Sequence, residues 1–437
     1  GIATGDLVAQ LAQWRQDGPI AGVYWLPALD DEGDLAALDL PAWQEALRRR
    51  VKTLYAAMRQ LYESSPFLVA ATRLGGLHGF DAAGATQPLG GAVTGFAKSY
   101  RKERPEALVK AVDFGPGVKD AAIAEQLVEE TLADPGCAEI GRAGEHRFGV
   151  AFREAPFPPL AEGRPEGAGM TLGKDSVFVV TGAAGSIVSA ITADLAAASG
   201  GTFHLLDLTP APDRDDPDLA AFRADREGLK ATIAARIKAA GGKATPVAIE
   251  RELARIERSN AALTAVQAVE AAGGTAHYCA VDLTDAEAVA RAMAQVRDRS
   301  GRIDVLLHAA GLEVSRNLPE KEPREFDLVF GVKADGWFNV MKAAADMPIG
   351  ATVAFSSVAG RFGNQGQTDY AAANDLLNKL CAALPASFPA TRFLSVDWGA
   401  WAEVGMASRG SLPAIMERAG IEMLQPAAAA PLLRSVK

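Results

Sequence analysis

Three features are scarce in this sequence: cysteine, long apolar runs and clustered basic residues. The three cysteines, Cys137, Cys279 and Cys381, are odd in number, far apart and without a CxxC pair, so reduced cytosolic thiols are expected rather than a disulfide framework. No stretch of about 18 uncharged apolar residues occurs, and the N-terminus does not resemble a signal peptide. These absences argue against a membrane protein and predict a cytoplasmic one.

An excess of basic charge is also missing. The chain has 54 Asp and Glu against 44 Lys and Arg, a formal net charge of −10. Because nucleic acids and anionic membranes attract clustered Lys and Arg, neither is an expected partner. With 437 residues, 49% of them hydrophobic, the chain is long enough for two domains. It opens on GIATG without a Met and is therefore interpreted as a piece of a longer polypeptide.

The first 150 or so residues alternate strand-like and helix-like runs, which predicts a parallel sheet flanked by helices. The expected elements are strands at 21–29, 67–74 and 108–114 and helices at 40–62 and 91–103. A Pro- and Gly-rich run without periodicity follows at 155–170 and marks a boundary between two lobes.

Beyond this boundary the pattern restarts as a second, complete doubly wound sheet. An apolar strand and a helix occupy 176–201, and further strands are predicted at 203–208, 278–283, 304–311, 351–357 and 393–399. The predicted fold is therefore α/β, with two Rossmann-like parallel-sheet subdomains. The expected domains are a structural subdomain at 1–160, a linker at 161–173 and a cofactor-binding subdomain at 174–437.

One interval in the second lobe is too long. Asp207 and Asp282 are separated by 74 residues, whereas a strand–helix–strand step needs about 30. The excess predicts a charged helical insertion at about 212–274. Within it, KAAGGKATPVAI (238–249) echoes EAAGGTAHYCAV (270–281), and only the second copy is expected to supply a strand. The insertion is interpreted as a solvated excursion or as a docking surface for a twin subunit or neighbouring domain.

A Gly-rich strand-to-helix turn, TGAAGSIV, opens the second lobe. Gly182 permits a tight turn, and Gly185 lets backbone amides approach a pyrophosphate at the positive end of the following helix. The third position, which usually carries Gly, is Val188. The predicted cofactor-binding residues are Thr181, Gly182, Ala184, Gly185, Ser186, Ile187, Asp207, Leu208, Asp282, Leu283, His308, Ala309, Ala310 and Gly311.

A similar Gly-rich sequence, GGLHG (75–79), lies in the first lobe. No long helical run follows it at once, and no acidic strand-end residue stands at the expected distance. We therefore interpret GGLHG as a turn rather than as a nucleotide site.

The chemistry of the chain is indicated by Ser357, Tyr370 and Asn374, which share the stretch FSSVAGRFGNQGQTDYAAAN, and by Lys333. Free tyrosine has a pKa of about 10 and is a poor acid at pH 7. A nearby ammonium favours the phenolate and lowers that pKa. A hydroxyl, a phenol and a cation together predict a site that hands a proton to a carbonyl oxygen. No metal site is predicted.

With these motifs in view, the second lobe resembles the short-chain dehydrogenase/reductases. More narrowly, it is similar to the ketoreductase domains of modular polyketide synthases and polyunsaturated-fatty-acid synthases. The likeness rests on TGAAGSI, VDLTD, HAAG, GVKADGWFN, FSSVAG…GQTDYAAAN and VDWGAWAEVGM. The first lobe resembles, more loosely, the structural subdomain of such ketoreductases, a degenerate Rossmann half.

The resemblance implies an activity and a role for each residue. It implies NADPH-dependent reduction of a β-ketoacyl thioester on an acyl carrier protein, within a multienzyme of synthase domains. Tyr370 is implied as proton donor, Ser357 as a hydrogen bond to the substrate carbonyl, and Lys333 and Asn374 as support. In most short-chain reductases the lysine stands four residues after the tyrosine, whereas here that position is Asn374, as in ketoreductases.

The resemblance also implies a lid over the substrate. Trp398, Trp401 and Met406 are expected beside the nicotinamide and acyl chain, or alternatively in the core. The following segment, 408–424, is expected to be a helical flap.

Several positions depart from the family pattern. The Leu-Asp-Asp signature of one stereochemical type is absent after HAAG, and Phe362 replaces the Trp that marks the other, so the alcohol configuration stays open. NADPH-dependent relatives carry Ser-Arg-Arg after the second strand, where this chain has Asp207 and Leu208. A carboxylate there suits an unphosphorylated ribose, although Arg214, Arg223 or Arg226 could compensate.

Three functions are therefore weighed. The leading one is an NADPH-dependent β-ketoacyl reductase of a polyketide or fatty-acid synthase. The second is a free-standing NAD-linked alcohol dehydrogenase of the same superfamily, and the third is a non-catalytic scaffold. A homodimer through the helical insertion is a further candidate partner.

Overall fold

The structure, a computed structural model, describes residues 4–154, 171–405, 416–418 and 420–435. The chain divides into two compact units, each made of segments that are distant in sequence. The first unit contains Gly1–Phe157, Gly311–Lys342 and Gly350–Trp398, and the second contains Pro158–Ala310, Ala343–Ile349 and Gly399–Lys437. This division does not follow the linear order of the predicted domains 1–160, 161–173 and 174–437, whose boundaries stay a prediction. The predicted Pro- and Gly-rich boundary at 155–170 lies outside the described residues.

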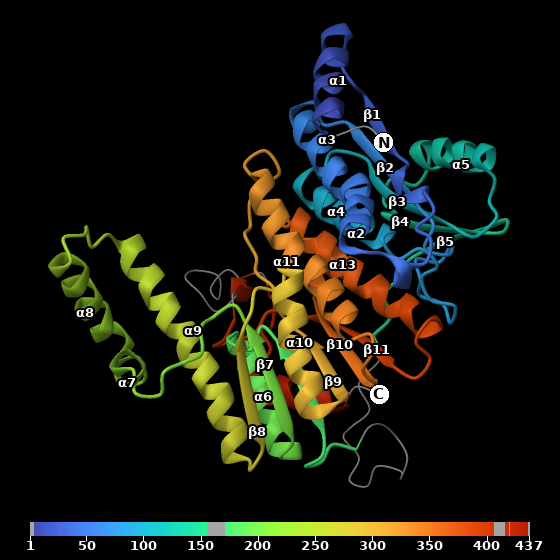
Figure 1. Cartoon of the computed structure of the whole chain (residues 1–437). Helices are drawn as coiled ribbons and strands as arrows, with labels where there is room; N and C mark the ends of the chain where they lie inside the picture. Colours follow the sequence, from blue (N-terminus) through green and yellow to red (C-terminus); the bar gives the residue numbers. More distant parts are fainter. Residues whose placement is uncertain (1–3, 155–170, 406–415, 419, 436–437) are drawn as a thin grey trace. The chain divides into compact units, whose positions relative to one another are not determined.

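The first unit contains a five-stranded sheet in the order β1-β2-β3-β4-β5 (Figure 1). Its strands are β1 (Gly22–Trp25), β2 (Phe67–Thr72), β3 (Val109–Phe114), β4 (Glu139–Ala143) and β5 (His146–Gly149). The first four strands are parallel, and β5 pairs with β4 in the antiparallel direction. Strands β2 and β3 are almost entirely buried and mostly apolar, as expected for a sheet covered on both faces, with Lys110 and Asp113 as buried charged exceptions in β3.

Helices surround this sheet. They are α1 (Thr4–Asp17), α2 (Leu40–Leu47), a π-helical turn (Arg48–Lys52), α3 (Thr53–Leu61), α4 (Gly90–Glu103) and α5 (Asp120–Leu132). The single helix predicted at 40–62 is thus three segments in one continuous run. Asp39 begins this run, because its side chain accepts a hydrogen bond from the backbone N–H of Ala42 at 2.8 Å.

The same unit contains the segment that carries Ser357, Tyr370, Asn374 and Lys333. Its elements are α11 (Pro323–Ala343), β10 (Ile349–Ser357), α12 (Val358–Phe362), α13 (Thr368–Ala383) and β11 (Arg392–Trp398). Strands β10 and β11 are parallel, with Ser357 opposite Trp398 in register. The core of the unit is continuous between the N-terminal helices and α13.

The second unit contains four parallel strands in the order β9-β6-β7-β8. The strands are β6 (Val177–Thr181), β7 (Thr202–Asp207), β8 (Thr275–Ala280) and β9 (Ile303–His308). The helices beside them include α6 (Ser186–Ser199), α9 (Pro246–Ala271) and α10 (Ala286–Ser300). Two sheets of this kind confirm the predicted α/β, Rossmann-like fold class.

The helical insertion is present, formed by α7 (Pro217–Ala224), α8 (Arg226–Ala239) and the first half of α9. In Figure 1 these helices pack on one another, and only the second half of α9 runs alongside α6. The insertion has a small core of its own that includes Leu219, Ile233 and Ile256. As predicted, only the second copy of the internal echo forms a strand, because residues from Pro246 onward begin α9 instead.

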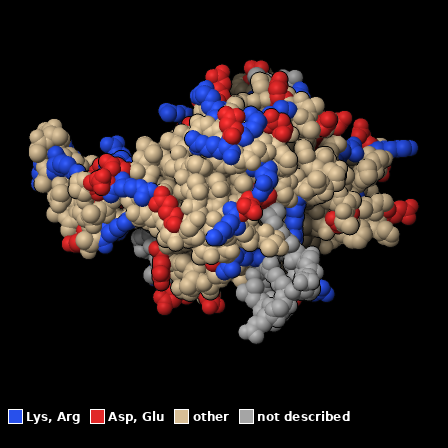
Figure 2. Space-filling model, turned by 60° about the horizontal axis from the view of Figure 1, so that its bottom comes forward, with Lys and Arg blue, Asp and Glu red and all other residues tan. Residues whose placement is uncertain are grey.

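None of the described helices is long and apolar enough to cross a membrane. Basic and acidic side chains alternate over the face shown in Figure 2, without a field of a single sign.

Candidate active site

Three of the predicted catalytic residues lie on adjoining elements of the first unit. Ser357 ends β10 and begins α12, where its Oγ accepts a hydrogen bond from the backbone N–H of Ala359 at 3.1 Å. Tyr370 lies in the first turn of α13, and Asn374 follows one turn later. Helices α12 and α13 approach closely because residue 360 is Gly: a Cβ there would lie 2.7 Å from Asn374 Cβ.

Lys333 approaches the same cluster from α11. Its side chain is 3% exposed, and its Nζ donates a hydrogen bond to the Phe355 carbonyl at 2.7 Å. Nζ lies 5.7 Å from the centroid of the Tyr370 ring. A Cβ at Gly311 would lie 2.7 Å from Lys333 Cε, so the HAAG motif ends directly against this side chain. The structure thus brings together all four residues that the sequence predicted.

The pKa of Tyr370 differs from the expectation. Burial raises it above its ordinary value, hydrogen bonds from Ser357 and Asn374 lower it in part, and the carboxylate of Glu313 raises it further. Burial also lowers the pKa of Lys333 to about 8. Burial is therefore the largest influence on the pKa of this phenol, which lies above its ordinary value rather than below it as expected.

Asn374 has a second feature suited to a working site. Its Nδ2 donates to the Tyr370 carbonyl at 2.7 Å, within the helix. Its Oδ1 is buried and has no hydrogen-bond partner in the described part of the chain. A buried amide oxygen left without a donor is costly, so this atom is placed to accept a hydrogen bond from water or substrate.

The N-terminal helices hold α13 in place through contacts that sequence reasoning missed. Gly91 and Gly95 of α4 let the two helices touch, since a Cβ at Gly95 would lie 2.3 Å from the Ala371 carbonyl oxygen. The Lys98 ammonium of α4 is 2.8 Å from Asp375 Oδ2, and both side chains are almost fully buried. The only sequence signals were a Lys and an Asp inside otherwise apolar helix faces.

The predicted cofactor turn lies in the second unit. Gly182 has a φ of +71°, and a Cβ there would lie 2.8 Å from Ala310 Cα, so only Gly fits. The Thr181 hydroxyl accepts hydrogen bonds from the backbone N–H groups of Ala309 and Ala310 at 3.1 and 3.2 Å. Gly185 precedes the 14-residue helix α6 directly. A tight Gly turn at a helix N-terminus fits a pyrophosphate.

The remaining predicted cofactor residues lie at the ends of β7, β8 and β9. Asp207 Oδ2 accepts from the backbone N–H of Ala184 at 2.9 Å, and its Oδ1 accepts from that of Thr209 at 2.7 Å. Leu208 beside it is 72% exposed. Asp282 is exposed and accepts from the Thr284 backbone N–H at 2.9 Å.

Four further predicted residues complete this description. Ser186 Oγ accepts a hydrogen bond from the Gly405 backbone N–H at 2.9 Å. Ile187 is partly buried in α6, and Leu283 is buried. The His308 ring nitrogen Nδ1 lies 3.3 Å from the Thr181 hydroxyl.

The arginines that were expected to compensate for Asp207 have other partners. Arg214 is ion-paired with Glu270. Arg223 donates to Asn260 and Gln267, and Arg226 lies 3.7 Å from Glu257. All three therefore contribute to packing within the insertion and α9.

The Gly-rich loop of the first lobe is held by the chain's own carboxylate. Asp113, at the end of β3, accepts hydrogen bonds from the backbone N–H groups of Leu74, Gly76 and His78 at 2.5, 2.6 and 2.8 Å. The Thr72 hydroxyl donates to it as well, at 2.8 Å. An acidic strand-end residue is therefore present, which the sequence analysis did not expect. Its carboxylate binds the backbone amides of the loop itself, in agreement with the interpretation of GGLHG as a turn.

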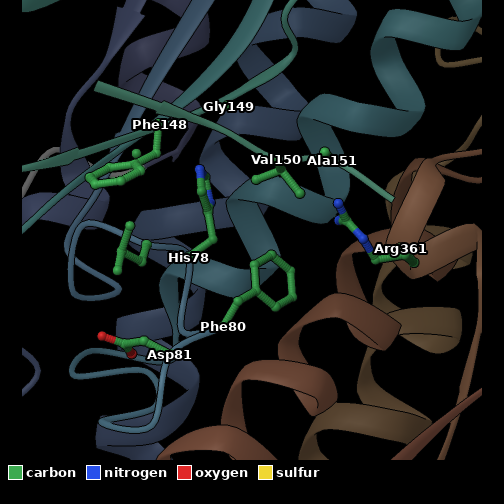
Figure 3. Close-up of a pocket in the computed structure, with 10 residues that line it drawn as sticks. His78, Phe80, Asp81, Phe148, Gly149, Val150, Ala151 and Arg361 are labelled. Carbon is green, nitrogen blue, oxygen red and sulfur yellow. The ribbon is translucent and has the colours of Figure 1, made fainter. Parts of the chain in front are cut away.

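A pocket of about 330 Å³ lies beside this loop (Figure 3). Its lining includes Phe80, Val150 and Arg361 on one side of His78 in the close-up and Phe148 on the other. The Arg361 guanidinium donates two hydrogen bonds to the Glu139 carboxylate, at 3.0 and 2.7 Å. The pocket thus lies against a structural ion pair of the first unit.

The predicted lid is only partly described. Trp398 is partly buried at the end of β11, and Trp401 is 1% exposed, so Trp401 is a core residue. Met406 and most of the predicted flap at 408–424 lie outside the described residues.

Comparison with known proteins agrees with this architecture. Residues 176–403, more than half of the chain, match the family model of the KR domain. The chain is 31% identical over 355 residues to a polyunsaturated fatty acid synthase of Thraustochytrium sp., covering 77% of this chain and 12% of that protein. It is 28% identical over 292 residues to polyketide synthase ThaG of Burkholderia thailandensis, covering 65% and 4%. The chain thus spans a small part of the relatives that it matches.

Solved structures show the same fold. An A1-type ketoreductase superposes with a TM-score of 0.70 at 22% identity, covering 99% of this chain and 78% of that one. A-type ketoreductases from a modular polyketide synthase give a TM-score of 0.68 at 23% identity, covering 99% and 79%. Together with the family match, these findings show that the chain belongs to the KR domain family, the ketoreductases of polyketide and polyunsaturated-fatty-acid synthases within the short-chain dehydrogenase/reductase superfamily.

Proposed function

We propose that this chain reduces the β-keto group of an acyl thioester carried on an acyl carrier protein, using NADPH, as one domain of a longer synthase. The observation that carries the proposal is the position of Tyr370 and Asn374 one turn apart on α13, beside Ser357 at the start of α12, with the buried Lys333 amine 5.7 Å from the Tyr370 ring centroid. Relatives of this family are parts of multidomain synthases, which supports neighbouring synthase domains and a carrier-bound substrate.

Each residue of the cluster has a proposed role. When bound, the nicotinamide supplies a hydride to the carbonyl carbon. Tyr370 donates its proton to the oxygen, and the Ser357 hydroxyl donates a hydrogen bond to the same atom, so both stabilise the charge that develops there. Lys333 stabilises the resulting phenolate by its charge. The buried Oδ1 of Asn374 accepts from a water that returns a proton to Tyr370.

The proposed cofactor residues are those of the turn after β6 and of the strand ends beside it. Gly182 and Gly185 give the backbone access to the pyrophosphate, and the N-terminus of α6 favours its negative charge. Asp282 would accept a hydrogen bond from the adenine amino group, and HAAG would lie along the adenosine. These assignments rest on the tight approach at Gly182 and on the position of each residue at a carboxyl end of a strand.

NADH is the second candidate cofactor, and one observation favours it. Asp207 ends β7 beside the Gly-rich turn, held there by Ala184. A carboxylate at this place binds the 2′-hydroxyl of NADH and repels the 2′-phosphate of NADPH. The three nearby arginines are bonded elsewhere, so nothing described at this strand end offsets the repulsion.

The decisive experiment follows oxidation of NADPH, and separately of NADH, at the nicotinamide absorbance band with a β-ketoacyl thioester mimic. We expect turnover in the wild type and a loss of about 10³-fold in kcat in Tyr370→Phe, because general acid catalysis contributes 10²–10⁴-fold. Turnover that survives in Tyr370→Phe would disprove the assigned proton donor. Absence of any dinucleotide binding would leave the scaffold function instead.

A further inference from the structure

A second lysine is buried beside Tyr370, and none of the roles above uses it. Lys321 Nζ lies 2.8 Å from Asp369 Oδ2, and both side chains are 0% exposed. The same Nζ donates to the Val314 carbonyl at 2.7 Å. Asp369 directly precedes Tyr370 in the first turn of α13, and its Oδ1 accepts from the Tyr370 backbone N–H at 2.8 Å. One ammonium thus joins the loop before α11 to the helical turn that carries the phenol.

The loop held by Lys321 carries a charge that acts on the phenol. Glu313 adjoins Val314, and its carboxylate raises the pKa of Tyr370 beyond the effect of burial. The loop also pairs with the segment before α13, since the Arg316 backbone N–H donates to the Gly366 carbonyl at 2.9 Å. The position of Glu313 relative to the phenol therefore depends on the hydrogen bonds that hold this loop.

The first lobe also forms hydrogen bonds to the loop before α11 and to the segment before α13. The Glu103 carboxylate of α4 accepts from the backbone N–H of Leu318 at 2.8 Å and from that of Gly366 at 3.2 Å. The Tyr55 hydroxyl of α3 donates to the Lys321 carbonyl. Lys321 is thus held at its backbone by the first lobe, and its ammonium is directed at the start of α13.

Stability alone does not account for this ion pair. Taking two charges out of water costs several kcal/mol for each ion, and apolar residues of similar volume are often as stable or more so. Burial raises the pKa of Asp369 although Lys321 lowers it, so desolvation opposes the ionised form of this carboxyl. An ion pair with both side chains 0% exposed, one residue before the proton donor and bonded to the loop that carries Glu313, points to a role in geometry.

We propose that Lys321 is a positioning residue for the ketoreduction. Through Asp369 and the Val314 carbonyl, it fixes the Tyr370 phenol and the Glu313 carboxylate relative to one another. The inference rests on the proposed function, with Tyr370 as proton donor. Because a misplacement of about 1 Å can cost 10²-fold in rate, loss of the ammonium is expected to lower kcat more than it changes KM.

The test compares Lys321→Met with the double variant Lys321→Met/Asp369→Leu. The single variant leaves a buried carboxylate without its partner, so we expect both its melting temperature and its kcat to fall. The double variant has no buried charge at this place and should regain most of the melting temperature. Its kcat should nevertheless stay about 10- to 100-fold below that of the wild type, with KM within about threefold. Recovery of wild-type kcat together with stability would overturn the proposal.

A matched control comes from the first lobe. Lys110 on β3 is also 0% exposed and is paired with the buried Glu130, but it lies on the five-stranded sheet rather than on the loop before α11. Glu130 keeps its ion pairs with Arg142 and Arg147, so Lys110→Met should lose less melting temperature than Lys321→Met. Its kcat, measured below its unfolding transition, should equal that of the wild type. An equal loss of kcat in both variants would mean that general destabilisation explains the effect.

A readout that needs no turnover separates this inference from the proposed function. The chain has six tyrosines, so the ¹³Cζ signal of Tyr370 can be assigned in labelled protein as the one missing from Tyr370→Phe. Lys321→Met should shift this signal and its titration midpoint, whereas Lys110→Met should not. A wild type without reductase activity but with this shift would refute the function and keep the positioning role.

An unchanged Tyr370 signal in Lys321→Met would refute the positioning role whatever the activity. If the double variant does not fold, Lys321→Met/Asp369→Asn takes its place under the same criteria. The amide oxygen can still accept a hydrogen bond from the Tyr370 N–H, and neither charge of the pair remains.

Discussion

The two Gly-rich loops of this protein look alike in sequence and differ in what their backbone amides hold. After β2, the amides of Leu74, Gly76 and His78 all bind the buried carboxylate of Asp113. The helix that follows, α4, begins only at Gly90, and its first amides meet Glu32 Oε2, 3.1 Å from the Leu89 nitrogen. The amides of the Gly-rich loop and those at the start of the helix that follows it are therefore both bound by the chain's own acids.

After β6, the arrangement is more open. The carboxylate of Asp207 binds one amide of the turn, that of Ala184, and α6 begins at once after Gly185. Glycine content alone therefore does not distinguish a nucleotide-binding turn from a Gly-rich loop that binds the chain's own carboxylate. The difference lies in acids at distant positions, Asp113 about forty residues after its loop and Glu32 about sixty before its helix, and these decide whether an external anion can bind.

The largest expected effect comes from removing the internal anion of the first lobe. Asp113→Ala leaves three buried backbone N–H groups and the Thr72 hydroxyl without their acceptor. Each unsatisfied buried group costs about 1–3 kcal/mol, although such costs do not add fully, so we expect a loss of roughly 4 kcal/mol in the free energy of unfolding. Urea denaturation measures it.

Asp113→Asn is the control for this change, since it keeps an acceptor oxygen and should lose less. Dinucleotide affinity of the folded Asp113→Ala protein should not change. A gain of nucleotide binding in the first lobe would show instead that the loop is a true site masked by its acid.

The converse experiment introduces a carboxylate at the Gly-rich turn of the second lobe. Gly185 stands at the N-cap of α6 with a φ of −75°, a conformation open to any residue, so Gly185→Asp places a carboxylate at the helix start. Its charge opposes the pyrophosphate, and we expect dinucleotide affinity, measured by calorimetry, to fall about 100-fold. Stability should hold because Asp is a good N-cap.

Gly185→Asn is the matched control for that charge, because it adds nearly the same atoms without it. A Cβ at this position lies 3.1 Å from the Gly182 carbonyl oxygen, so some affinity should be lost in both variants. If the Asn variant loses as much affinity as the Asp variant, shape rather than charge governs the turn.

Glu32 makes the first lobe sensitive to pH. Burial raises its pKa to about 7, against the lowering effect of Arg50 and the amides of Leu89 and Gly90. Because the folded-state pKa lies above the unfolded value, the folded state binds the extra proton between about pH 4.5 and 7. Its contribution to stability is therefore full at low pH and is lost as the pH rises through 7.

Comparison of wild type with Glu32→Gln isolates this contribution. The free energy of unfolding of the wild type should fall by roughly 2 kcal/mol more than that of Glu32→Gln between pH 5 and pH 8. Urea titrations at unit steps of pH measure the difference. Parallel curves for the two proteins would show that Glu32 is ionised throughout this range and acts as a permanent cap of α4.

Local pattern predicted much of this molecule. The strands of the second sheet lie within three residues of their predicted positions, because apolar runs between turn residues fix them. The short antiparallel strand β5 was not predicted, since its residues HRFG are exposed and carry no buried alternation. The π-helical turn Arg48–Lys52 was missed as well, because a change of hydrogen-bonding partner leaves the apolar spacing almost unaltered.

The candidate site also contains residues that the sequence predicted and contacts that it did not. Ser357, Tyr370, Asn374 and Lys333 were found from spacing and family likeness, and the structure brings them together. The ion pairs of Lys321 with Asp369 and of Lys98 with Asp375 join residues 48 and 277 positions apart, a separation that no local pattern encodes. The pKa of Tyr370 was misjudged for the same reason, since burial depends on the whole packed unit.

The smallest expected effect concerns the ribose end of the cofactor, where Asp207 is the one turn-binding acid that the second lobe retains. Asp207→Asn keeps an acceptor near Ala184 and removes the charge that opposes a 2′-phosphate. We expect the ratio of NADPH to NADH affinity, measured by nicotinamide fluorescence, to rise about 10-fold. Asp282→Asn, also an acid at a strand end but tied to Thr284, should leave this ratio unchanged. An equal rise in both variants would mean that net charge, rather than contact with the ribose, sets the preference, and Asp207 would then resemble Asp113, an acid that serves only its own backbone.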